Sequence, residues 1–210
     1  MSVHVKICGI TRREDALLAE RLGAFAVGFV FYPGSPRYIE PEAAGVISRS
    51  LGPFIARIGV FVDEDPGTVR AAVSAAGLTA VQLHGSESPA YVRELNGITV
   101  IKAFRVGDGF DPRVLADYPL DFFLLDTAVK GVYGGSGKAF DWKRALPCRA
   151  FGNIIIAGGI TSENVREAVR IAGPWGVDVS GGLESSPGMK DATKMRAFFR
   201  ALGRNTVDYE

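Results

Sequence analysis

The sequence is poor in cysteine and histidine, with two residues of each type among 210. Cys8 and Cys148 are too few for a disulfide framework, and a reducing compartment would keep both as thiols. No apolar run approaches the roughly 20 residues that a membrane helix needs, and the chain reaches Lys6 after too few apolar residues for a secretory signal. We therefore expect a cytoplasmic protein without a membrane-spanning segment.

An excess of charge of either sign is also missing. Lysine and arginine total 24 against 23 aspartates and glutamates, and no basic block marks a surface for nucleic acid. A small-molecule partner is expected instead. With 47% hydrophobic residues the chain can bury one large core, so we expect a single domain over residues 1–210 with a frayed tail from about residue 204. The sequence leaves both a monomer and a homodimer open.

What the chain does contain is a repeated alternation of strand-like and helix-like segments. Apolar runs rich in valine, isoleucine and phenylalanine predict eight strands, at residues 3–8, 25–31, 55–62, 79–84, 98–104, 121–126, 153–157 and 175–180. Residues 11–23 have apolar residues at helical spacing, with Thr11 as the expected N-cap and Gly23 as the stop. The same pattern recurs at residues 64–77, 161–173 and 187–203. Strand then helix, repeated, predicts an α/β fold in which eight parallel strands close into a (β/α)8 TIM barrel.

Polar residues at the ends of the strands are the informative positions, because a barrel builds its site from the C-terminal strand ends and the loops that follow. Cys8 ends the first strand. Lys6 precedes it by two residues, so both side chains point to the same face, and a nearby ammonium would favour the thiolate that a base or nucleophile requires. The alternative is a small buried hydrophobe, the usual fate of a free cysteine.

Asp126 ends the otherwise apolar sixth strand, in "FFLLDTAV". Apolar surroundings favour the protonated form of a carboxyl group, which suits it to donate a proton near neutral pH. Its alternative role is to cap or anchor the following loop. If Cys8 and Asp126 face each other across the barrel mouth, they form a base and an acid.

Two glycine-bearing turns follow the last two strands, "AGGIT" at 157–161 and "VSGGLE" at 179–184. Bare backbone N–H groups in such turns can approach a phosphate without interference from Cβ. Barrels frequently bind phosphate at this place, so the two turns together predict a phosphate site, although either alone is more often only a turn.

Other strand-end residues have two readings each. Arg37, on a loop stiffened by two prolines, can grip a carboxylate or simply lie on the surface. His84 can contact substrate or cap its loop. Lys102 can form a Schiff base with a carbonyl substrate or belong to an internal ion pair, in which Asp178 would neutralise Lys6 and Lys102. The roles of Asp63 and Arg105 stay open, whereas His4 and Cys148 are expected to be structural.

A glycine-rich segment, "GVYGGSGKAFDW" at 131–142, follows the sixth strand. Its length and its place beside Asp126 predict a lid that closes over substrate and excludes water. The Walker spacing is absent from it, which argues against nucleotide hydrolysis.

Taken together, "KICGIT", "SPRYI", "VQLHG", "LLD", "GGSGKAFDW", "IAGGIT" and "GVDVSGGLE" with "GMKD" make the chain resemble the phosphoribosylanthranilate isomerase family of tryptophan biosynthesis, from residue 3 to about 199. The resemblance implies an Amadori rearrangement of N-(5'-phosphoribosyl)anthranilate to 1-(2-carboxyphenylamino)-1-deoxyribulose 5-phosphate, with neither cofactor nor metal. By the family pattern Asp126 is the general acid, Cys8 the base that removes the C2 proton, and Arg37 the partner of the anthranilate carboxylate. His84 and Asp178 are further substrate-binding candidates. The phosphate would lie at Gly158, Gly159, Ser180, Gly181 and Gly182.

One departure from the family pattern is glycine at 181, where "VSSGVE" is common and this chain has "VSGGLE". The backbone N–H is kept and a hydroxyl is lost, so phosphate binding should survive without a side-chain contact from 181.

Three rival hypotheses remain at this point. The chain can be another phosphosugar barrel, such as the histidine-pathway aminoaldose isomerase, or a Schiff-base aldolase acting through Lys102. It can also be a barrel that only binds a phosphorylated ligand. An intact set of Cys8, Asp126 and Arg37 favours the isomerase over a pure binder, which has no need of an acid–base pair.

Overall fold

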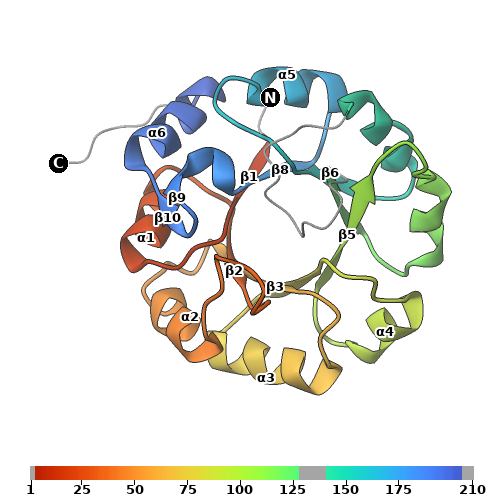
Figure 1. Ribbon diagram of the computed structural model, residues 1–210, viewed down its shortest axis with the longest axis horizontal. Coiled ribbons are helices and arrows are strands. Elements are labelled where there is room, and N and C mark those ends of the chain that lie inside the picture. The colour runs from red at the N-terminus through yellow and green to blue at the C-terminus, as the bar shows by residue number, and fades with distance from the viewer. Residues whose placement is uncertain (1–2, 128–140, 205–210) are drawn as a thin grey trace.

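Eight parallel strands close into a barrel in the computed structural model, which describes residues 3–127 and 141–204 (Figure 1). Each strand pairs with the next one along the chain, and the first pairs with the eighth. The strands are β1 (His4–Cys8), β2 (Ala26–Val30), β3 (Ala56–Phe61), β4 (Ala80–Leu83), β5 (Val100–Val106), β6 (Phe122–Thr127), β7 (Asn153–Ile156) and β8 (Gly176–Val179). The eight-stranded barrel predicted from the sequence is therefore confirmed.

Helices surround the strands on the outside of the barrel (Figure 1). The α-helices are α1 (Arg13–Arg21), α2 (Pro41–Ser48), α3 (Pro66–Ala76), α4 (Pro89–Glu94), α5 (Val165–Ala172) and α6 (Ala192–Ala201). Short 3-10 helices lie after β5 and in the described residues before β7, namely η1 (Pro112–Asp117), η2 (Trp142–Ala145) and η3 (Pro147–Ala150). No helix in the described part of the chain is both long and apolar enough to cross a membrane.

The helix ends follow the sequence signals in part. Gly77 and Gly173 adopt the left-handed conformation directly after α3 and α5, where a side chain would be strained. The expected N-cap of α1 was wrong, because Arg12 occupies that position. The Thr11 hydroxyl instead donates to the carbonyl of Gly188, which ties the start of α1 to a distant part of the chain.

The predicted helix at 187–203 begins later than expected. After β8 the chain forms a turn, η4 (Gly181–Leu183), and then a two-stranded hairpin of β9 (Glu184–Ser186) and β10 (Met189–Lys190). Asp191 caps α6, since its side chain accepts from the backbone N–H groups of Thr193 and Lys194. Residues 187–190 therefore belong to the hairpin and its turn.

The interior of the barrel is apolar towards the N-terminal ends of the strands and polar towards their C-terminal ends. One apolar cluster lies inside the barrel and is separate from the large core between strands and helices. It includes Ala26, Ile58, Ala80, Ile101, Leu124 and Ile155. Towards the C-terminal strand ends the buried side chains are polar, including Lys6, Gln82, Asp126 and Asp178. The buried polar side chains of the barrel interior that can take part in a reaction therefore lie at the C-terminal ends of the strands.

Candidate active site

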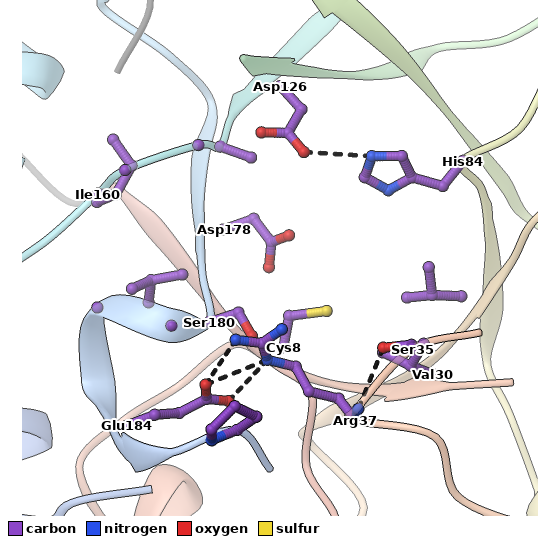
Figure 2. A pocket seen from close by; sticks show the side chains of 18 of the residues that line it. Cys8, Val30, Ser35, Arg37, His84, Asp126, Ile160, Asp178, Ser180 and Glu184 are labelled. Atoms are coloured by element: carbon purple, nitrogen blue, oxygen red, sulfur yellow. Dashed lines mark hydrogen bonds and ion pairs between the residues drawn. The ribbon is translucent and has the colours of Figure 1, made fainter. Parts of the chain in front are cut away.

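A cavity of about 450 Å³ opens at the C-terminal ends of the strands. All ten site residues predicted from the sequence line it, and they come from β1, β6 and β8 and from the loops after β2, β4, β7 and β8. These are Cys8, Arg37, His84, Asp126, Gly158, Gly159, Asp178, Ser180, Gly181 and Gly182. Figure 2 labels the six of them that are not glycine. The predicted lid at 131–142 falls outside the described residues except for Asp141 and Trp142, which begin η2.

Cys8 lies at the end of β1, is 8% exposed and shares its face with Lys6. A Cβ on Gly28 of β2 would meet the Cys8 sulfur at 2.9 Å and the Lys6 Nζ at 3.1 Å, so glycine at 28 leaves room for both side chains. Burial raises the pKa of the Cys8 thiol, and it outweighs the Lys6 ammonium, which lowers that pKa. The prediction that the Lys6 ammonium favours the thiolate agrees with this, whereas the net upward direction of the pKa is set by burial.

Asp126 has two polar neighbours at the end of β6. Its Oδ1 accepts from the backbone N–H of Thr127 at 2.7 Å, and its Oδ2 lies 3.3 Å from the His84 Nε2 (Figure 2). The Gln82 amide donates to the His84 Nδ1 at 2.9 Å, which leaves the ring proton on Nε2, the nitrogen facing Asp126. Gln82, which sequence reasoning missed, therefore orients the histidine that faces the carboxyl group.

The buried lysines have separate partners. Lys6 pairs with Asp178 at 2.9 Å, as predicted, so the charge beside Cys8 is balanced. Lys102 pairs with Glu87 at 3.0 Å instead of with Asp178, and its Nζ also donates to the carbonyls of Gly85 and Ala103. Asp178, the partner of Lys6, lines the cavity, but Lys102 and its partner Glu87 do not. Lys102 is buried among β4, β5 and the loop after β4. The geometry thus gives no support to a Schiff base at Lys102.

Four glycines on one side of the cavity have backbone N–H groups without a partner among the described residues. They are Gly158, Gly159, Gly181 and Gly182, and all four line the cavity. Gly158 has a φ of +78°, and a Cβ there would lie 2.6 Å from the Asp126 Oδ1. Unpaired N–H groups in such turns are suited to the oxygens of a phosphate.

Arg37 is fixed at the cavity by a residue that sequence reasoning missed. Glu184 of β9 accepts from the Arg37 Nε at 2.9 Å and from its Nη2 at 2.7 Å (Figure 2). Lys190 of β10 donates to the same carboxylate at 2.7 Å. A Cβ on Gly9 would meet the Arg37 Cδ at 2.6 Å, so glycine at 9 lets the arginine cross the end of β1. The sequence signal for the pairing of Arg37 with Glu184 is weak. It consists of the motifs "GLE", which contains Glu184, and "GMKD", which contains Lys190, at a fixed spacing.

Fold and cavity together define a (β/α)8-barrel protein that joins a thiol, a carboxyl group and two glycine-bearing turns at the C-terminal ends of its strands. Residues 5–201 match the model of the family described as N-(5'phosphoribosyl)anthranilate (PRA) isomerase. The N-(5'-phosphoribosyl)anthranilate isomerase of Geobacter sp. (strain M21) is 48% identical over 194 residues, which cover 92% of this chain and 95% of the relative. The chain therefore belongs to the N-(5'-phosphoribosyl)anthranilate isomerase family.

Solved structures agree with this membership. The phosphoribosyl anthranilate isomerase of Thermus thermophilus has a TM-score of 0.89 at 46% identity, covering 96% of this chain and 98% of that one. A phosphoribosyl anthranilate isomerase in complex with reduced 1-(o-carboxyphenylamino)-1-deoxyribulose 5-phosphate has a TM-score of 0.85 at 44% identity, covering 96% and 100%. Monomers generated from the dimeric enzyme of Thermotoga maritima give 0.84 at 41% identity, covering 96% and 99%.

Proposed function

We propose that the cavity catalyses the Amadori rearrangement of N-(5'-phosphoribosyl)anthranilate to 1-(2-carboxyphenylamino)-1-deoxyribulose 5-phosphate, a step of tryptophan biosynthesis. The observation that carries the proposal is that Cys8 and Asp126, from β1 and β6, line one cavity together with two glycine-bearing turns and an arginine. The isomerase family of the chain supports the same reaction.

Asp126 is the general acid of the proposed reaction. Its protonated carboxyl group gives a proton to the furanose ring oxygen, the C1–O bond breaks, and the nitrogen lone pair completes a Schiff base that carries a positive charge. His84 and the Thr127 N–H hold the two carboxyl oxygens, so the group needs little reorganisation when it ionises.

Cys8 is the base that then removes the C2 proton, leaving an enolamine that tautomerises to the ketone. A thiol with a raised pKa needs help to ionise, and two nearby cations supply it. The Lys6 ammonium is present in the resting site, and the Schiff-base cation forms in the same cavity during the reaction. The thiolate is therefore favoured at the stage at which it is used.

Substrate binding is divided between backbone N–H groups and one arginine side chain. The phosphate is assigned to the N–H groups of Gly158, Gly159, Gly181 and Gly182, and the anthranilate carboxylate to Arg37. Loss of a side-chain hydroxyl at 181 does not affect this assignment, since the N–H groups come from the backbone.

Product analysis with the purified protein tests the proposal. We expect the fluorescence of phosphoribosylanthranilate to disappear and the aminoketose phosphate to form in equal amount. Binding without turnover would indicate a barrel that only holds a phosphorylated ligand. A borohydride-trapped adduct on Lys102 would indicate an aldolase. Either result contradicts the isomerase assignment.

We also propose a homodimer formed through the N-terminal end of the barrel. Phe54, on the loop before β3, is 96% exposed, and an apolar hollow of about 190 Å³ lies at the same end. The rings that line that hollow pack in tilted and edge-to-face arrangements and belong to His4, Phe25, Phe122 and Trp175. A protruding side chain and a hollow on one face suit a two-fold pairing of identical copies, and the relative from Thermotoga maritima is described as dimeric.

A cytoplasmic location is proposed from the low cysteine content alone.

A further inference from the structure

Glu184 is a buried carboxylate that the proposed reaction does not use. It begins β9, is 7% exposed and has cations on both sides. Arg37 donates to it through Nε and Nη2, and Lys190, whose side chain is fully buried, donates to its Oε1. Burial alone would raise the pKa of Glu184, but the hydrogen bond from Arg37 and the charge of Lys190 outweigh it and lower that pKa. The residue is therefore an anion at neutral pH.

The bond pattern fixes how the Arg37 guanidinium faces the cavity. Two of its three nitrogens are engaged in the fork to Glu184, while Nη1 donates to no described residue. A fork of this kind holds the guanidinium plane in one orientation, which a single hydrogen bond does not do. The remaining nitrogen is then preset for a second planar anion.

The charges of the cluster also suit an incoming anion. One carboxylate between Arg37 and Lys190 leaves a net charge of +1 at this end of the cavity. Lys190 further donates to the carbonyls of Cys8 and Ser180, so the cluster is anchored to β1 and to the turn after β8. The positive charge of Arg37 is therefore not fully neutralised by Glu184, and Arg37 can attract a carboxylate of the substrate.

We infer that Glu184 is a positioning residue that presets Arg37 and thereby makes the site selective for an amine that carries an ortho carboxylate. The inference rests on the proposed function, in which Arg37 holds the anthranilate carboxylate. Glu184 itself does not touch the substrate in this scheme.

The test compares two substrates made from ribose 5-phosphate, one with anthranilate and one with aniline, which lacks the carboxylate. The readout is the ratio of their kcat/KM values, which is independent of the amount of folded protein. We expect Glu184→Ala to lower the ratio about 10-fold or more, chiefly through KM for the anthranilate compound. Glu184→Gln keeps one acceptor oxygen and should give an intermediate ratio, and it also serves if the alanine variant fails to fold.

Two further variants make the result decisive. Glu87→Gln removes a buried carboxylate paired with Lys102 away from the cavity, and it should leave the ratio unchanged. Arg37→Met sets the lowest ratio, and the double variant Arg37→Met with Glu184→Ala should not lower it further. If Arg37→Met lowers the ratio while both Glu184 variants lower kcat/KM equally for the two substrates, the inference is wrong and Glu184 is merely structural. If Arg37→Met leaves the ratio unchanged, the carboxylate assignment of Arg37 fails, and the inference fails with it.

Discussion

Cys8 lies between opposing electrostatic influences at the scale of the single residue. Burial and the Asp178 carboxylate raise the pKa of its thiol, while Lys6 and Lys190 lower it, and the net direction is upward from 9.0. Because the group is an acid whose protonated form is favoured in the folded protein, the thiolate forms only at a higher pH than in the unfolded chain.

Alkylation of Cys8 provides a test of this direction. In a Cys148→Ala background, so that only one thiol reacts, we expect the rate with iodoacetamide to reach half of its maximum at a higher pH in the folded protein than in the unfolded one. The same protein unfolded in urea should reach half-maximum near the ordinary cysteine value. A folded midpoint below the unfolded one would show that the cations dominate and that our assignment of the resting form is wrong.

The sequence could place Lys6 and Cys8 on one face because strand alternation is a local rule. It could not give the pKa direction of Cys8, since burial depends on β2 and β8 closing around the residue, and these strands are distant along the chain. Gln82 was missed for the same reason. Its role is to orient His84 towards Asp126, and Asp126 comes from β6, which is distant along the chain.

The loop after β7 shows how an element supports the site. Gly158 is needed there twice, for its positive φ and because a Cβ would lie 2.3 Å from the Thr127 Oγ1 and 2.6 Å from the Asp126 Oδ1. We expect Gly158→Ala to lower kcat/KM on the order of 10-fold or more, because it displaces the acid and an N–H of the proposed phosphate site together.

Gly97→Ala is the matched control for this prediction. Gly97 has a φ of +81°, but nothing lies within 4 Å of a Cβ built there. Gly97→Ala should lose about 1–2 kcal/mol of unfolding free energy from backbone strain, measured by urea denaturation. Gly158→Ala should lose at least as much because of its added close contacts, and only Gly158→Ala should lose activity. Equal kcat/KM values for the two variants would contradict a role of the loop in holding the acid.

Elements were predictable where the pattern was long and regular. The eight strands and the helices α1, α3 and α5 follow from apolar periodicity and from glycines at the helix ends. The β9–β10 hairpin was missed because its two short strands show no alternation, and its "PGMKD" letters merge with the start of α6. The pairing of Glu184 with Arg37 was missed along with it, since the hairpin positions the carboxylate.

At the scale of the whole molecule, the two ends of the barrel differ in chemistry. The C-terminal end is polar and the N-terminal end carries the apolar hollow and Phe54. We expect the protein to sediment as a dimer at micromolar concentration, and Phe54→Asp to shift it to monomer, because the substitution places a charge in an apolar contact. Val46→Asp, at a position of α2 that is 59% exposed, should remain dimeric. A monomeric parent protein, or a dimer that survives Phe54→Asp, would contradict the proposed interface.

The central claim is that one proton acceptor and one proton donor act on a single sugar phosphate from facing strands of the barrel. The kcat values of Cys8→Ala and Asp126→Asn under saturating phosphoribosylanthranilate test it most directly, with unfolding curves to show that both variants are folded. We predict a fall of about 10²-fold or more in kcat for each, with smaller changes in KM, and a double variant whose loss is less than the product of the two. A near-normal kcat in either folded variant would contradict the account.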